Sequence, residues 1–108
     1  MHDIDGIRGI LHELKADLFN LYGSSLKQII VYGSYARNEA TEHSDIDLVI
    51  VLEGKITPGR EIDRMIDIIS DLNIKHGVLI SIYPVSETDY KTVNSPLLLN
   101  VRKEGVAA

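Results

Sequence analysis

The sequence predicts an α/β or α+β domain, in which helices pack against a small β-sheet. The 108 residues suit one domain and leave no room for a second, so we expect a single domain over residues 1–108. The chain is 44% apolar and 25% charged, as expected for a globular protein with one core. Apolar periodicity divides it in the order helix, strand, strand, helix, strand, helix, which is typical of a sheet with helices on it.

The first segment, residues 3–22, predicts a helix that packs on the core. Its apolar residues recur at spacings of three and four and therefore lie on one face. They are Ile4, Ile7, Leu11, Leu14, Leu18 and Leu21. A coiled coil is the alternative, but the pattern lasts only about three heptads and a strand follows at once.

Two short apolar runs then predict neighbouring strands. Residues 28–32 (QIIVY) are β-branched and aromatic, and their near-continuous apolar character indicates a strand buried on both faces. Residues 46–52 (IDLVIVL) form the second run, which a Thr57-Pro58-Gly59 turn follows.

Residues 60–75 predict a second helix. Its apolar positions at helical spacing are Ile62, Met65, Ile66, Ile69 and Leu72. Three aspartates lie four positions apart on the opposite face, namely Asp63, Asp67 and Asp71. We expect a solvated acidic row with Arg60 and Arg64 as its ion partners, in preference to a cation site.

The remaining residues predict a third strand and short helices. The strand covers residues 78–85, and Pro84 places its end at a sheet edge or at the exit from the sheet. Helical turns follow Ser86, and a last helix starts at Pro96 and ends at Gly105.

Composition argues against several functional classes. The net charge of −5 disfavours binding to a DNA or RNA polymer, whose phosphates attract basic proteins. The absence of cysteine excludes disulfides and thiolate metal sites and fits a reducing compartment. No apolar run approaches the ~20 residues that span a bilayer, and the N-terminus lacks signal-peptide features. We expect a cytoplasmic protein without a membrane or nucleic-acid partner.

A glycine–serine pair follows the first predicted strand. If Tyr35-Ala36-Arg37 opens a short helix, the backbone amides after Gly33 and Ser34 would suit a phosphate, which glycine lets approach closely. Taken alone, Gly-Ser after a strand is more often a plain turn.

Two aspartates mark the start of the second strand. Asp45 and Asp47 are two positions apart, so the strand pleat directs both carboxylates to the same side. Mg²⁺ is commonly held by one or two carboxylates together with substrate phosphates. Taken alone, the two aspartates are better explained as exposed turn residues at the entrance of the strand. The nearby Gly33-Ser34 pair favours a magnesium and phosphate site.

Together, these features resemble a known family. The string GSYARNEATEHSDIDLVIV (residues 33–51) is similar to the Gly-Ser and Ser-Asp-x-Asp-Leu signature of the DNA polymerase beta-like nucleotidyltransferases, specifically their minimal nucleotidyltransferase branch. The resemblance covers nearly the whole chain, including residues 95–105. It implies the polymerase beta-like fold, a small mixed sheet with helices packed on it.

The resemblance also implies roles for individual residues. Gly33 and Ser34 would contact nucleotide phosphates, and Arg37 would either join them or be an ordinary surface arginine. Asp45 and Asp47 would be the catalytic residues and would hold two Mg²⁺ ions. The reaction would be nucleotidyl transfer, in which a hydroxyl attacks the α-phosphorus of ATP or another nucleoside triphosphate and pyrophosphate leaves.

The resemblance implies a protein partner as well. In the minimal branch it is often a HEPN-domain toxin, and the small protein serves as its antitoxin. We therefore expect transfer of a nucleoside monophosphate, AMP foremost, to a hydroxyl of such a partner. Whether the chain also forms an oligomer is left open.

One departure from the family pattern favours an alternative. Active members carry a third carboxylate on the next strand, where this chain has Ser81, which is neither anionic nor a useful base. The alternative is a weakly active or inactive module that binds nucleotide or its partner and neutralises that partner by contact. A structural phosphate-binding domain would require the Asp45 and Asp47 pair to be incidental.

We also make predictions for three other residues of the motif, namely Asn38, Tyr35 and His43. Asn38 replaces a glycine that is common in the family, and asparagine also tolerates left-handed backbone geometry. Tyr35 could line the nucleotide pocket, although a half-buried role is the alternative. We expect His43 to be a solvated loop residue.

Overall fold

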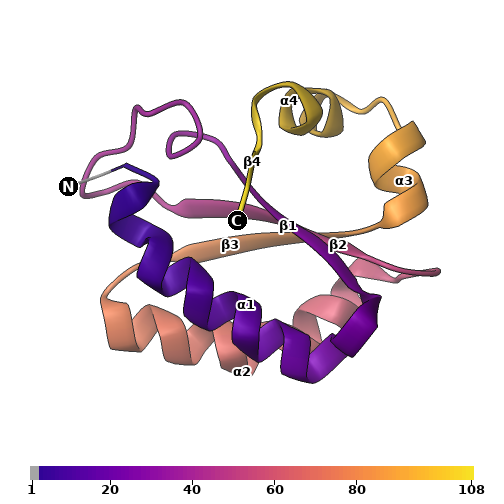
Figure 1. Cartoon of the computed structure of the whole chain (residues 1–108), viewed down its shortest axis with the longest axis horizontal. Coiled ribbons are helices and arrows are strands. Elements are labelled where there is room, and N and C mark those ends of the chain that lie inside the picture. The colour runs from indigo at the N-terminus through magenta and orange to yellow at the C-terminus, as the bar shows by residue number, and fades with distance from the viewer. Residues whose placement is uncertain (1–2) are drawn as a thin grey trace.

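The computed structural model describes residues 3–108 and contains a four-stranded mixed sheet with helices on both faces (Figure 1). The elements are η1 (Asp5–Ile7), α1 (Arg8–Tyr22), η2 (Gly23–Ser25), β1 (Leu26–Tyr32), β2 (Ile46–Leu52), α2 (Pro58–His76), β3 (Ile80–Ser86), α3 (Glu87–Thr92), α4 (Pro96–Glu104) and β4 (Val106–Ala107). The predicted fold class, element order and mixed sheet are confirmed. Within the described residues, every helix is too short or too polar to span a bilayer.

The strand order is β3-β2-β1-β4, with β2 antiparallel to β1 and parallel to β3. The two predicted neighbouring strands are therefore adjacent. β3 lies at an edge of the sheet, as Pro84 predicts. The register sets Asp47 opposite Tyr32 on β1 and beside Ser81 on β3.

One face of the sheet is covered by α1 and α2 (Figure 1). The apolar stripe of α1 packs there, and Leu14 and Leu18 are fully buried. From α2, the side chains of Met65, Ile69 and Leu72 join the same core. The predicted burial of Ile66 is wrong, because its side chain is 47% exposed.

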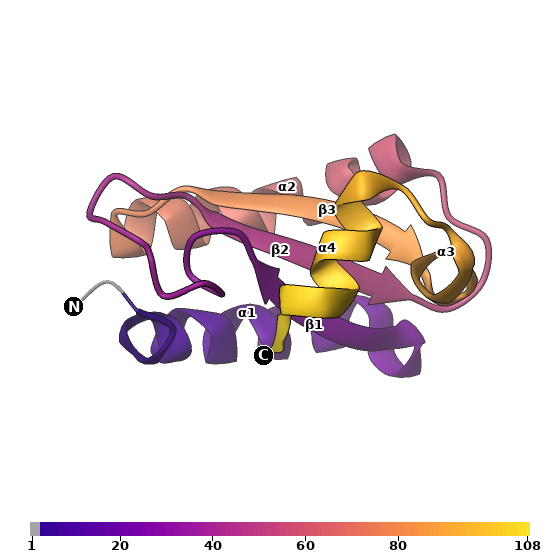
Figure 2. The same ribbon diagram turned by 90° about the horizontal axis from the view of Figure 1, so that it is seen from above.

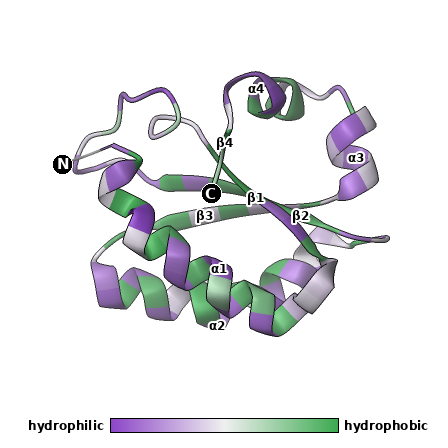
Figure 3. Cartoon of the chain, viewed as in Figure 1, coloured by the Kyte–Doolittle hydropathy of each residue, from purple (hydrophilic) through white to green (hydrophobic). Residues whose placement is uncertain are grey.

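The second face is covered only in part, by α3 and α4 (Figure 2). Leu98 and Val101 of α4 pack on Val49 and Val51 of β2. Because side chains alternate along a strand, Asp47 lies on this same face, two residues before Val49. The strands are mostly apolar and α3 is mostly hydrophilic (Figure 3).

Gly105 ends α4 as predicted, but its backbone is not left-handed, with φ of −64°. The glycine is needed for close packing, since a Cβ atom there would lie 2.5 Å from Cγ2 of Ile30. This close approach brings the chain onto β1, where β4 pairs with Ile30 and Val31. β4 is not predicted from the sequence.

Arg64 does not pair with the aspartate row of α2. Its guanidinium donates to Glu61 at 3.2 Å and lies over the ring of Tyr22, 4.6 Å from the centroid. Glu61 is buried and also accepts a hydrogen bond from the hydroxyl of Tyr22 at 2.7 Å. The row itself is exposed, as predicted. The guanidinium prefers Glu61 because burial lowers the screening of that carboxylate by water.

Glu13 links α1 to the last turn of α2 through Lys75 and His76. The hydrogen bonds from Lys75 and His76 lower the pKa of Glu13. A lowered carboxyl pKa contributes stability above the ordinary value of 4.5, and this contribution is lost as the pH falls through the lowered pKa. We expect Glu13→Gln to be less stable than the native protein at pH 7, and the difference should vanish in acid. Urea unfolding between pH 3 and 7 tests this, with Asp67→Asn as the control.

Candidate functional site

Asp45 and Asp47 lie at the start of β2, at the end of the sheet where the loop from Gly33 to Ser44 returns. Asp45 is exposed and Asp47 is half-buried. Burial and the neighbouring charge of Asp45 raise the pKa of Asp47, against the opposing effect of Arg37. The two carboxylates are therefore close enough to repel each other, and a cation would relieve both the repulsion and the lost hydration.

Gly33 touches Asp47 directly. Its φ is +75°, a conformation that favours glycine, and a Cβ atom there would lie 2.5 Å from Oδ2 of Asp47. No side chain therefore separates the glycine backbone from this carboxylate. The glycine–serine pair and the aspartates, 11 to 14 residues apart in sequence, meet at one place.

The segment after Gly33 forms consecutive turns and not the predicted short helix. The amide of Arg37 donates to the carbonyl of Gly33 at 3.1 Å, but Asn38 has φ of +59° and interrupts the helical geometry. The expectation that asparagine accepts a left-handed conformation here is confirmed. Among the described residues, no backbone carbonyl accepts from the amides of Ser34, Tyr35 or Ala36, which leaves these amides available to a ligand.

Arg37 is held beside the carboxylates by two glutamates. Its Nε donates to Glu39 at 2.7 Å, and its Nη1 lies 3.8 Å from Glu104 at the end of α4. The hydrogen bond to Glu39, with the charges of Glu39, Glu104 and Asp47, raises the pKa of the Arg37 guanidinium. Arg37 is therefore near enough to Asp47 for their charges to interact, and Glu39 and Glu104 both lie beside its guanidinium.

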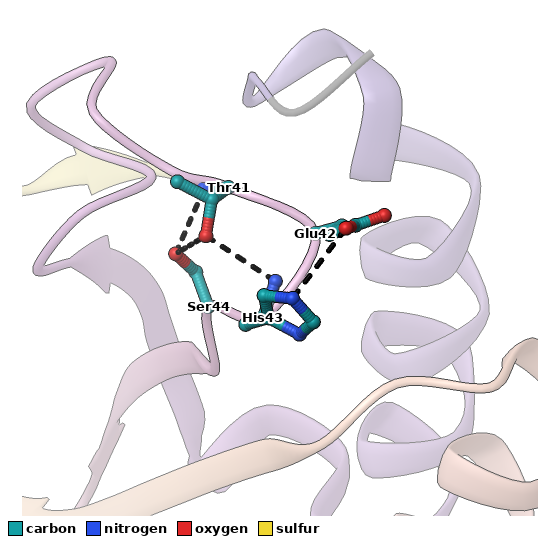
Figure 4. Close-up of polar contacts among 4 residues, drawn as sticks. All are labelled: Thr41, Glu42, His43 and Ser44. Atoms are coloured by element: carbon teal, nitrogen blue, oxygen red, sulfur yellow. Dashed lines mark hydrogen bonds and ion pairs between the residues drawn. The ribbon is translucent and has the colours of Figure 1, made fainter.

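A compact turn leads the chain into Asp45 (Figure 4). The amide of Thr41 donates to the hydroxyl of Ser44 at 2.8 Å, and the amide of Ser44 donates to the carbonyl of Thr41 at 3.1 Å. The side chain of His43 is 87% exposed, as predicted for a solvated loop residue; its ring lies 3.4 Å from Glu42, and its backbone amide donates to Oγ1 of Thr41 at 3.2 Å (Figure 4). The serine of the Ser-Asp-x-Asp motif therefore orients the first aspartate by closing this turn.

Ser81 is exposed and lies beside Asp47 on the same face of the sheet. This is the position at which the sequence comparison expects a third carboxylate. Within residues 3–108, no group of three or more His, Asp or Glu side chains is arranged to hold a metal ion. The site therefore offers two carboxylates and a neutral hydroxyl.

Two tyrosines of the sheet border the site, and sequence reasoning gave them no role there. Tyr32 is paired with Asp47, and Tyr83 lies two residues after Ser81. Burial and the charges of Asp47 and Tyr83 raise the pKa of Tyr32. In the sequence, only the position of Tyr32 next to Gly33 indicates that this tyrosine lies near the site. Tyr35 is not at the pocket, because its side chain is 7% exposed and belongs to the core under α1.

Comparisons with known proteins relate this chain to one protein family. Residues 10–95 match a family described as nucleotidyltransferase domain. The chain is also similar to proteins of Methanocaldococcus jannaschii whose provisional names are protein adenylyltransferase. One is 36% identical over 106 residues, covering 97% of this chain and 96% of the relative. Another is 32% identical over 97 residues, covering 90% of this chain and 93% of the relative.

Two solved structures share the fold at low sequence identity. A toxin–antitoxin complex crystallised with AMP-PNP gives a TM-score of 0.61 at 15% identity, covering 87% of this chain and 68% of that one. A mutant of the toxin–antitoxin complex MntA-HpeT gives a TM-score of 0.58 at 13% identity, covering 86% and 67%.

Proposed function

Because the chain belongs to the nucleotidyltransferase domain family, we propose that it transfers a nucleoside monophosphate, AMP foremost, from a nucleoside triphosphate to a hydroxyl of a partner protein. The observation that carries this proposal is the direct contact between the Gly33 backbone and the half-buried Asp47, with Asp45 beside it. A phosphate-binding turn and a pair of carboxylates are thereby joined in one site.

The carboxylates fit Mg²⁺. Asp45 and Asp47 supply hard oxygen donors, and their crowding makes a bound cation favourable. When bound, Mg²⁺ would neutralise phosphate oxygens and stabilise the charge that develops on the attacking and leaving oxygens. By resemblance to the family, we propose that Asp45 and Asp47 hold two Mg²⁺ ions.

The other residues would position the nucleotide. The amides of Ser34, Tyr35 and Ala36 can donate to phosphate oxygens, and the Asp47 carboxylate beside them occupies the space that a side chain at Gly33 would fill. Arg37, held by Glu39 and Glu104, would add positive charge at the rim. The acceptor hydroxyl would then attack the α-phosphorus, the bond to pyrophosphate would break, and the hydroxyl proton would pass to a carboxylate or to water.

We further propose that the acceptor belongs to a toxin of the HEPN class and that the chain acts as its cytoplasmic antitoxin. The names of the relatives support transfer of AMP to a protein, and the solved neighbours are toxin–antitoxin complexes, one with an ATP analogue.

Label transfer tests the proposal. The chain and a partner protein that co-purifies with it would be incubated with Mg²⁺ and ATP labelled either at the α-phosphate or at the γ-phosphate. We expect the α-label to appear on the partner protein and the γ-label to stay in pyrophosphate. Label from the γ-phosphate on the partner, or none on it from either position, would contradict nucleotidyl transfer.

Ser81 favours a second candidate function, a module that binds nucleotide and blocks its partner by contact without efficient transfer. Within residues 3–108 no third carboxylate joins Asp45 and Asp47 in a metal-binding group, and Ser81 beside Asp47 is neutral, so deprotonation of the acceptor lacks a dedicated base. Partner inhibition that persists in Asp45→Asn and Asp47→Asn would favour this candidate.

We expect Ser81→Asp to fold, because the side chain is exposed, and to increase transfer activity. The added carboxylate lies beside Asp47, so it should also enlarge the rise in melting temperature that Mg²⁺ causes. Ser81→Asn, which has the same size without the charge, should show neither effect. Thermal melts with and without Mg²⁺ check this, and an equal response of both variants would remove position 81 from the site.

A further inference from the structure

A groove of about 510 Å³ lies between α1 and the outer edge of β1. From α1 it is lined by Lys15 and Phe19, and from β1 by residues 26–29, while Ala108 lies at one end. Phe19 is 58% exposed, although the preceding Leu18 is fully buried. The only phenylalanine of the chain thus presents its ring at this groove instead of the core.

The floor of the groove includes a stretch of sheet edge that β4 does not cover. β4 pairs with Ile30 and Val31, and the amide of Ala108 donates to the carbonyl of Ile29 at 2.9 Å. The register of β1 against β2 shifts between Leu26 and Gln28, so the regular alternation of hydrogen-bonding directions is interrupted at Lys27. Within residues 3–108, no strand pairs with β1 at this position.

The groove is basic as well as apolar, in a chain whose net charge is −5. Its lining includes His12, Lys15 and Lys27 and no acidic side chain. Lys15 Nζ lies 3.4 Å from the backbone oxygen of Ala108, and Lys27 Nζ lies 3.4 Å from Oε1 of Glu53, which is not part of the lining. Lys15 lies on α1 and Lys27 on β1, so both elements contribute positive charge to the groove.

We propose that this groove binds an extended, acidic segment of a partner protein. The segment lies along β1 beyond β4, places an apolar side chain against Phe19, and sets acidic side chains against Lys15 and Lys27. The register shift between Leu26 and Gln28 disrupts the backbone ladder along this stretch of β1. Side-chain contacts therefore supply most of the affinity and the preference for acidic sequences.

This surface is separate from the carboxylate site. Lys27 and Gly33 are six residues apart along β1, which is about 20 Å in a strand. A partner held in the groove leaves Asp45 and Asp47 accessible. The inference does not depend on nucleotidyl transfer, and a failure of either proposal leaves the other intact.

Fluorescence anisotropy with two labelled peptides tests the proposal. Both are about ten residues long and alternate valine with a charged residue, aspartate in one and lysine in the other. We expect the acidic peptide to bind at least tenfold more tightly than the basic one, with an affinity that falls as salt rises. Phe19→Ser should weaken binding at least tenfold. Ile74→Ser is the matched control, because that side chain is 83% exposed on α2 and outside the groove.

Three outcomes overturn the proposal. The first is no saturable binding of the acidic peptide, or equal binding of both peptides. The second is unchanged affinity in Phe19→Ser, with circular dichroism showing that the variant is folded. The third is a concentration-dependent dimer that Phe19→Ser dissociates, since a second copy of the chain would then occupy the groove.

Discussion

Gly33→Ala should lower the melting temperature by several degrees and abolish Mg²⁺-dependent binding of ATP. The φ of +75° at this position costs an alanine roughly 1 kcal/mol or more, and the added methyl carbon would lie 2.5 Å from Oδ2 of Asp47. Either the turn or the carboxylate must move. For a domain of about 100 residues, each 1 kcal/mol lowers the melting temperature by about 4–8 °C. Differential scanning calorimetry and a nucleotide titration measure the two effects.

The variant Gly54→Ala is a control that measures the effect of backbone strain without a steric clash. Gly54 has φ of +84°, but a Cβ atom there meets nothing within 4 Å. We expect this control to lose stability through strain alone and to keep its affinity for nucleotide. If both variants lose the same stability and both still bind ATP, the contact between Gly33 and Asp47 has no role in binding.

Asp47→Asn should abolish Mg²⁺-dependent nucleotide binding while the fold stays at least as stable as the native one at pH 7. The substitution keeps the shape of the side chain and removes one of two crowded charges. Isothermal titration with Mg²⁺ and a non-hydrolysable ATP analogue tests the loss of binding. Asp63→Asn, on the exposed face of α2, is the control and should bind normally.

The pH dependence of the same variant gives a second readout. The pKa of Asp47 is raised in the folded protein, so the folded state holds this proton more tightly than the unfolded chain does. The native domain therefore loses stability as the pH rises from about 3.8 through the raised pKa, and the variant does not. Unfolding in the absence of Mg²⁺, from pH 3 to 8, should show the difference growing toward neutral pH. A variant that is less stable than the native protein at pH 7 would contradict this assignment.

The parts of the fold that have a strong local signal are predictable from sequence. β2 has the predicted bounds, Ile46–Leu52, because its run of apolar residues is flanked by polar ones. The helix α1 follows its apolar stripe and ends at Gly23. β4 has no such signal, since two residues become a strand only because Gly105 lets the chain approach Ile30.

The sequence predicts where the motif residues of the candidate site lie, but it does not predict the contacts that surround them. Spacing alone places Asp45 and Asp47 on one side of a strand, but the contact of Asp47 with Gly33 depends on the pairing of β1 with β2. Arg37 finds Glu104 across the fold, and no local pattern indicates this pair. Tyr35 is buried because the turn after Gly33 directs its side chain into the core, which the linear motif does not reveal.

The central claim is that Mg²⁺ and ATP bind at the contact between Gly33 and Asp47. At 12.0 kDa the chain suits NMR, and Mn²⁺ in place of Mg²⁺ broadens the amide resonances nearest to the bound ion. With ATP present, we predict that the amides of Ser34, Asp45, Asp47 and Ser81 are the first to broaden. Broadening that instead centres on the aspartate row of α2, or that spreads evenly over the surface, would contradict the claim.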